Sequence, residues 1–193
     1  MSYGYPLGLP IPTGVPLRPK SPLWADRPPV VALTVRQPWA WSICYAGKRV
    51  ENRGWRPRRQ QVPFTIAIHA GARPKGRDHL DMEKQILRLV DYDLHIPKTW
   101  WETPDSSRPR VPEDGLNHFD WSAIVAVATI IGFYADDDPP QITSPDKYWY
   151  LGPVGWKLQD VYALPEPVAC RGSQSLWSMD PQTRAAVHKQ LSG

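Results

Sequence analysis

The sequence predicts an α+β protein built on a small β-barrel of five or six strands, flanked by about three helices. Two observations lead to this expectation. Short β-branched segments, either alternating or continuously apolar, recur along the chain, and about three segments with helical signals lie between them. The chain has 193 residues, 41% of them hydrophobic, which is enough for one folded domain with its own core.

The first 29 residues differ in composition from the rest. Eight prolines recur there, mixed with glycine: Pro6, Pro10, Pro12, Pro16, Pro19, Pro22, Pro28 and Pro29. Such a segment lacks the donors and the periodicity of helix or sheet, so we expect a disordered, proline-rich tail over residues 1–29 and a domain over residues 30–193. An inert extension or a strap over the barrel is the favoured interpretation of the tail, and a partner-docking segment is the alternative.

The first half of the domain contains the clearest local signals. Pro38 is placed to begin a short, buried helix, because a first-turn proline loses no helical hydrogen bond, and Gly47 ends this helix. A histidine at a strand end, such as His69, is more often structural than catalytic. The expected elements are a strand at Val30–Val35, a helix at Trp39–Tyr45, an extended segment at Lys48–Trp55 and a strand at Phe64–Ala70.

The second half begins with an amphipathic helix expected at Arg77–Tyr92 and a long irregular insertion at Ile96–Asn117. The nearly continuous apolar run Ser122–Tyr134 predicts a strand buried on both faces. Shorter strands are expected at Tyr148–Tyr150, Val154–Leu164 and Val168–Cys170, followed by a terminal helix at Pro181–Leu191 with Asp180 as its N-cap.

Positive charge is concentrated between residues 48 and 59. That stretch balances to +5, whereas the whole chain carries only +4. Tryptophans lie within and beside it, at Trp39, Trp41 and Trp55. A local basic patch with interleaved aromatic residues is typical of nucleic-acid binding, because cations meet phosphates and indole rings stack on bases.

The same region resembles a known family. The opening Leu33–Ala40 (LTVRQPWA), together with Lys48, Glu51 and Arg53, is similar to the ASCH domain, whose signature is written G-x-K-x-x-E-x-R; Ala46 stands at the glycine position. Gly152–Trp156, Cys170–Gly172 and Leu176–Trp177 resemble the closing strands of that family. The likeness covers roughly Val30 to Met179 and implies a PUA-like β-barrel that handles RNA or DNA.

The resemblance implies a cleft between barrel and helices, with Lys48, Glu51 and Arg53 at its centre. We expect this cleft to hold RNA or DNA, with a single or modified base stacked inside it. The sequence leaves open whether RNA or DNA binds, and which base. The expected nucleic-acid-binding residues are Arg36, Trp39, Lys48, Arg49, Arg53, Trp55, Arg56, Arg58, Arg59, Trp156 and Arg171.

The alternative is a hydrolase acting at the same cleft, a ribonuclease or a modified-nucleoside amidohydrolase. Lys48 would be the base, with Glu51 as the second catalytic residue. Neighbouring arginines are expected to lower the pKa of Lys48 and Glu51 to oppose that shift. The threonine of the amidohydrolases that the family contains would fall at Glu51, so that constellation is incomplete here.

We expect no cofactor and no metal site. Asp136–Asp138 precede a Pro-Pro step and are interpreted as a solvated loop. The two cysteines, Cys44 and Cys170, are expected to be reduced thiols, with a disulfide between them left open. With neither a signal peptide nor a membrane-spanning run, we expect a cytoplasmic protein with no membrane partner. The oligomeric state is left open.

Overall fold

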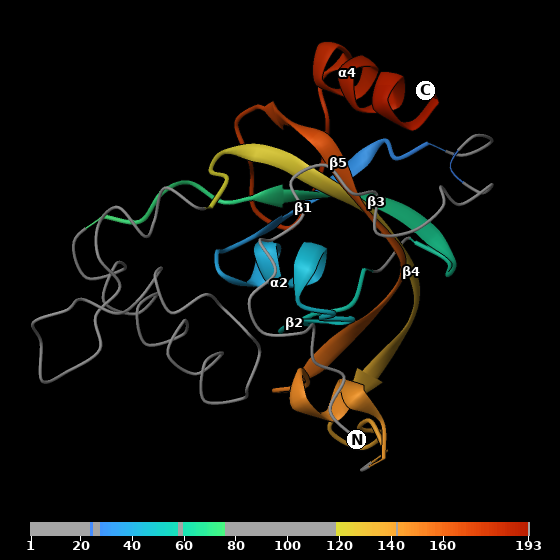
Figure 1. Cartoon of the computed structure of the whole chain (residues 1–193). Coiled ribbons are helices and arrows are strands. Elements are labelled where there is room, and N and C mark those ends of the chain that lie inside the picture. Colours follow the sequence, from blue (N-terminus) through green and yellow to red (C-terminus); the bar gives the residue numbers. More distant parts are fainter. Residues whose placement is uncertain (1–23, 25–27, 58–59, 76–118, 142, 193) are drawn as a thin grey trace, which may run out of the picture.

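The computed structural model describes residues 24, 28–57, 60–75, 119–141 and 143–192. Six strands form one mixed sheet in the order β2-β5-β4-β3-β1-β6. Their bounds are β1 Val31–Val35, β2 Val50–Arg53, β3 Phe64–Ala70, β4 Ala123–Ala135, β5 Val154–Ala169 and β6 Leu176–Ser178. The sheet curls into a half-barrel, as Figure 1 shows. The expected α+β class and strand number are therefore confirmed.

Two α-helices and one 3-10 helix occur in the described part of the chain: α2 Trp39–Tyr45, η3 Pro145–Tyr148 and α4 Pro181–Ser192. This is fewer α-helices than the sequence predicts, and the expected helix at residues 77–92 lies outside the described residues, as does the insertion at 96–117. Most of the expected tail at residues 1–29 also lies outside them. No helix in the described ranges has the length and apolar character needed to cross a membrane.

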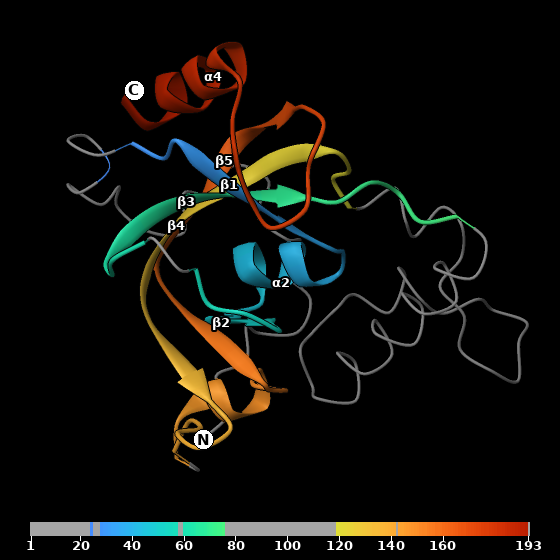
Figure 2. The same ribbon diagram turned by 180° about the vertical axis from the view of Figure 1, so that it is seen from behind.

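The sheet buries side chains on both faces, and in the described part of the chain one α-helix packs on each face. Inside the curve, α2 packs against β3, β4 and β5, as seen from opposite sides in Figures 1 and 2. Val187 and Leu191 of α4 pack on the other face with Tyr162 and with Trp24. Because β4 is central and both faces are covered, its first eight residues are buried, as the continuous apolar run predicts.

The long strands β4 and β5 pair antiparallel with several register shifts. Ala126 pairs with Ala163 and Ile124 with Val168, so residues 164–167 are opposed by one residue of β4. Pro165 and Pro167 fall in this bulged stretch, where a missing backbone donor breaks no ladder bond. For this reason the two strands expected at Val154–Leu164 and Val168–Cys170 are one continuous strand.

The strand expected at Tyr148–Tyr150 is wrong. Pro145–Tyr148 is a 3-10 helix, and the Ser144 hydroxyl caps it by accepting the Asp146 backbone N–H at 3.2 Å. The capped Ser-Pro-Asp start outweighs the strand preference of the aromatic residues that follow. β6, by contrast, has only three residues, and local strand signals do not indicate it. It includes Leu176 and Trp177, which belong to the segment that resembles the closing strands of the ASCH family.

The terminal helix begins where the sequence places it. The Asp180 carboxylate accepts the backbone N–H groups of Gln182 and Thr183 at 3.0 and 2.9 Å. This is the expected N-cap, since it satisfies donors that the first helical turn leaves free. Pro38 stands one position before the first residue of α2 rather than inside it.

Candidate functional site

A polar pocket opens where the two ends of the curled sheet approach each other. The order of strands puts β2 at one edge and β1 and β6 at the other. The pocket has a volume of about 500 Å³, within the range of small-molecule sites. Its walls come from the end of β1, the start of α2, β2 with the residues after it, and the loop before β6. The lining residues are Thr34, Arg36, Trp39, Glu51, Asn52, Arg53, Trp55, Ser173, Gln174 and Ser175.

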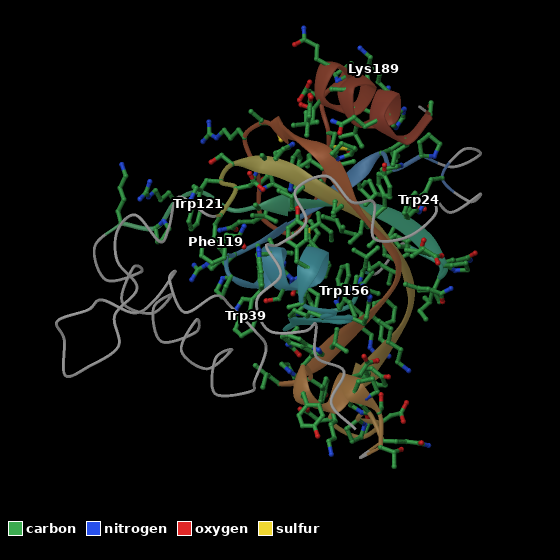
Figure 3. The ribbon with its side chains drawn as sticks, in the orientation of Figure 1. Trp24, Trp39, Phe119, Trp121, Trp156 and Lys189 are labelled. Atoms are coloured by element: carbon green, nitrogen blue, oxygen red, sulfur yellow. The ribbon has the colours of Figure 1, made fainter. Side chains whose placement is uncertain are left out.

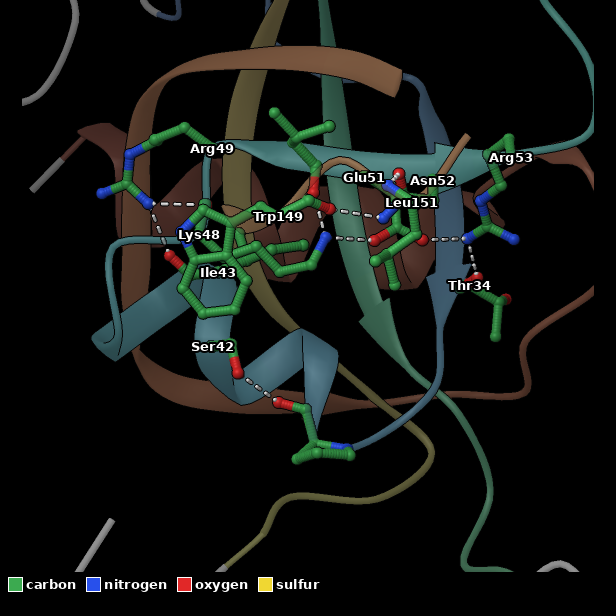
Figure 4. Close-up of polar contacts among 12 residues, drawn as sticks. Thr34, Ser42, Ile43, Lys48, Arg49, Glu51, Asn52, Arg53, Trp149 and Leu151 are labelled. Atoms are coloured by element: carbon green, nitrogen blue, oxygen red, sulfur yellow. Dashed lines mark hydrogen bonds and ion pairs between the residues drawn. The ribbon is translucent and has the colours of Figure 1, made fainter. Parts of the chain in front are cut away.

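A row of three charged side chains starts at Lys48, just before β2, and continues through Glu51 and Arg53 of that strand, both of which line the pocket. Lys48 Nζ lies 2.9 Å from Glu51 Oε2, and Arg53 Nη2 lies 3.2 Å from Glu51 Oε1. Arg53 Nη2 also donates to the backbone oxygen of Thr34 in β1, at 2.5 Å. Figure 4 shows this row of contacts from Lys48 to Thr34. Arg53 therefore joins strands from the two ends of the sheet by a side-chain contact.

Lys48 is the most deeply buried charge of the row. Its side chain is 2% exposed, and its ammonium donates to Glu51 and to the backbone oxygen of Val50. Burial lowers the pKa of Lys48, and the Glu51 carboxylate opposes this effect. The direction is the expected one, but the main cause is desolvation, and the charge of Arg53 contributes less.

The predicted aromatic residues divide between pocket and core. Trp39 and Trp55 are half-buried and line the pocket. Trp156, predicted as a pocket wall, is 0% exposed and lies inside the curve of the sheet (Figure 3). Its indole N–H donates to the backbone oxygen of Trp55 at 3.0 Å, and the two rings meet edge-on at 4.9 Å. Trp156 thus holds Trp55 in place and is not itself in the pocket wall.

The predicted basic residues also separate. Arg36 is exposed at the pocket wall, and Arg56 is exposed with its guanidinium 5.6 Å from the ring of Phe133. Arg49 is half-buried and donates to the backbone oxygens of Ile43 and Lys48, both at 2.9 Å, which fixes the turn after α2. Arg171 is exposed just before the loop that forms one wall. Arg58 and Arg59 lie outside the described residues.

Residues 173–175 form a wall that the sequence did not indicate. The Thr34 hydroxyl donates to the backbone oxygen of Ser173 at 2.8 Å and accepts the indole N–H of Trp177 at 3.1 Å. Small polar residues in a loop carry no recognisable signal of binding. A hint is available in Gly172, because a glycine beside a short loop often marks a close approach of the backbone to another group.

His69 lies behind this loop and is not among the pocket-lining residues. It is 1% exposed, its Nε2 lies 3.2 Å from the backbone oxygen of Cys170, and its ring meets Trp177 edge-on. Its Nδ1 is buried without a partner in the described structure. A Cβ on Gly172 would lie 2.3 Å from His69 Cε1, so the loop backbone rests directly against this ring.

Other candidate chemistry is limited among the described residues. No group of three or more histidine, cysteine or acidic side chains there is arranged to hold a metal ion. Cys44 and Cys170 are both free thiols, and they belong to the cores on opposite faces of the sheet.

Fold and site together define an α+β protein with a curled mixed sheet and a tryptophan-lined, positively charged pocket where the sheet ends meet. No known protein-family model matches this chain, and no curated protein is significantly similar to it.

Proposed function

We propose that this protein is a nucleic-acid-binding module of the ASCH type, within the PUA-like group, and that a single base enters the pocket between the sheet ends. The observation that carries the proposal is the composition of that pocket. Two tryptophans, Trp39 and Trp55, line the same cavity as two arginines, Arg36 and Arg53. Indole surfaces stack on bases, and exposed guanidinium groups pair with phosphates.

The distribution of exposure supports separate roles for the basic residues. Arg36, Arg56 and Arg171 are exposed, so they are free to meet the phosphates of a strand that passes the pocket. Lys48 is buried and paired with Glu51, so it holds the shape of the site and meets no phosphate in this arrangement. Removing Lys48 acts on binding through Glu51 and Arg53.

The test is a gel panel with single-stranded RNA, single-stranded DNA and duplex DNA, at low and moderate salt. We expect shifted, intact bands that weaken with salt, because phosphate contacts release counterions. Trp39→Ala should weaken binding by about 1–3 kcal/mol if a base stacks on this ring. Tyr148→Ala is the matched control, since Tyr148 is an aromatic residue that is 58% exposed and not among the pocket-lining residues.

Two arginine variants, tested in the same gel panel, measure the contribution of phosphate contacts to binding. Arg36→Ala should lower the slope of log K against log salt by about 0.7, the value for one phosphate of a single strand. Arg184→Ala removes the same charge from an exposed position on α4 and should leave the slope unchanged. If no polymer shifts at low salt, or if both arginine variants behave alike, the proposal is wrong.

A hydrolase with Lys48 as its base is the second candidate. The observation in its favour is that burial lowers the pKa of Lys48, since a neutral amine can accept a proton. The paired, 2% exposed ammonium speaks against direct contact with substrate. Denaturing gels of the same samples decide the matter: RNA shortened by wild type and intact with a folded Lys48→Ala variant would replace the binding proposal by this one.

A further inference from the structure

The hydrogen-bonding groups of the pocket are unequally available. Both Glu51 oxygens are already paired, Oε2 with Lys48 and Oε1 with Arg53. The Lys48–Glu51–Arg53 row contains two cations and one carboxylate, so it carries a net positive charge. A positive, water-poor floor favours ligand atoms that accept hydrogen bonds over atoms that donate them.

Arg53 is the charged residue of the row that still has donors to offer. Its side chain is 22% exposed, and among the described residues its guanidinium is engaged through Nη2, with Thr34 and Glu51, while the buried Nε has no partner there. Nη1 has no partner among the described residues, and Figure 4 shows this nitrogen directed away from Glu51. Because Nη2 is held by Thr34 on one side of the pocket and by Glu51 on the other, the plane of the guanidinium is fixed before a ligand binds.

The Thr34 hydroxyl, which also lines the pocket, does not offer a free acceptor that would offset the donors of Arg53. The proton of Thr34 Oγ1 is given to Ser173, and the same oxygen accepts from Trp177. Ser173, Gln174 and Ser175 are all exposed, so their side chains lie at the rim and remain solvated. The amide of Asn52, a half-buried lining residue, is already engaged, because it donates to the Trp149 backbone oxygen and accepts the Leu151 backbone N–H. Among the described lining residues, the fixed and partly desolvated side chain with capacity left is therefore that of Arg53, a donor.

We propose that the pocket selects guanine or uracil/thymine over adenine and cytosine, and that Arg53 reads the base by donating from Nη1 to O6 of guanine or to O4 of uracil or thymine. This inference rests on the proposed function. Guanine presents O6 and N7 as acceptors and thymine presents O4, whereas adenine and cytosine place an amino donor at the equivalent position. An amino group facing Arg53 would bring two donors together and leave both without an acceptor.

The same donor could instead take a phosphate oxygen, which is also an acceptor. The two sources differ in one testable respect. A phosphate contact is independent of the base, whereas a carbonyl contact disappears when the base is changed or removed.

The experiment uses nine-residue single strands in which one central nucleotide carries a base and the other eight positions are abasic. Every strand then has the same number of phosphates. The strands are made with uracil or thymine, guanine, adenine or cytosine at the centre, and one is abasic throughout. Binding to the 193-residue chain is measured by fluorescence anisotropy at fixed salt, with strands of RNA or DNA, whichever binds in the gel panel.

We expect the two keto bases to bind about tenfold more tightly than adenine and cytosine, the discrimination typical of one well-made arginine–base contact. Arg53→Lys keeps the charge but loses the planar fork, and it should remove the preference while retaining salt-dependent binding. The wild-type comparison needs no variant, so the inference remains testable if Arg53→Lys proves unstable in a thermal melt.

Three results would overturn the inference and leave the proposed function intact: equal binding of all four bases, tighter binding of adenine or cytosine, or an abasic strand that binds as well as the keto bases. The last result would assign Arg53 to a phosphate. No binding of any strand, in this assay and in the gel panel, would overturn both the inference and the proposed function.

Discussion

Replacing Glu51 by glutamine tests the charge row most directly. The substitution keeps the size of the side chain but removes the negative charge between Lys48 and Arg53. Lys48 is 2% exposed, so water cannot replace the lost carboxylate. Breaking a buried ion pair by removing one partner typically costs about 3–5 kcal/mol, because an uncompensated charge stays behind. In a protein of this size the loss corresponds to a melting temperature lower by about 6–20 °C.

The assay is urea unfolding at neutral pH, compared with thermal melts of the same proteins. Glu166→Gln makes the same chemical change at an exposed position that has no ion pair in the described structure, and it should cost under about 0.5 kcal/mol. The double variant Glu51→Gln with Lys48→Met removes both charges and should recover much of the loss, since an apolar replacement leaves no buried charge.

The pH dependence gives an independent check on the same reasoning. Burial lowers the pKa of Lys48 in the folded protein below its ordinary 10.5, and without Glu51 the opposing effect is gone. Between the folded and unfolded pKa values the unfolded state binds more protons, so stability increases with pH there. The deficit of Glu51→Gln should therefore shrink as pH rises toward 10.5. A loss below about 1 kcal/mol, or a deficit that does not change with pH, would refute this account of the row.

Three further predictions concern the surroundings of the pocket. Gly172→Ala places a Cβ 2.3 Å from the ring of His69, so we expect a loss of about 1–3 kcal/mol in urea unfolding and weaker nucleic-acid binding. Gly54→Ala is the control and should be neutral, because its Cβ meets nothing within 4 Å in the described structure. Equal effects of the two substitutions would contradict the close approach of Gly172 to His69. His69→Phe removes a buried histidine whose pKa is lowered by burial. Measured as unfolding free energy from pH 7.5 to 5, the stability advantage of wild type should be full above pH 6.5 and decline as pH falls below it. A difference that stays constant with pH would argue against a neutral, buried ring. Trp24→Ala should lower the free energy of unfolding by about 3–5 kcal/mol, because this ring is 2% exposed and packs edge-on against Tyr162 at 5.6 Å. A melting temperature as little changed as that of Tyr148→Ala would show that the indole does not belong to the core.

Much of the fold follows from local sequence signals. The strand Phe64–Ala70 and the helix Trp39–Tyr45 lie where alternation and a buried apolar run place them. Asp180 caps the last helix as expected. These three features are predicted correctly because each depends on residues that are close together in the sequence. The strand prediction at Tyr148–Tyr150 is wrong because the preceding Ser-Pro-Asp segment forms a capped 3-10 helix, which outweighs the strand propensity of the aromatic residues.

The positive stretch shows the limit of reading charge along the chain. Residues 48–53 are adjacent in sequence, yet Lys48 is buried, Arg49 ties down a turn, and Arg53 reaches the pocket. The sequence predicts one phosphate-binding surface for these cations. Their different positions follow from tertiary contacts: Arg49 donates to Ile43 of α2, whereas Arg53 reaches Thr34 of β1 at the other end of the curled sheet.

The sequence by itself determined most of the elements in the described part of the chain, the α+β class, and the association of basic residues with tryptophans near β2. Only the tertiary structure decided which of these side chains share a cavity. Thr34 and Ser173 are far apart along the chain, and a hydrogen bond of 2.8 Å brings them together at the pocket. The same curl buries Trp156 and leaves Trp55 in the pocket wall. The physical reason is that helix and strand signals are local, whereas burial depends on the pairing of strands distant in sequence, which local patterns do not specify.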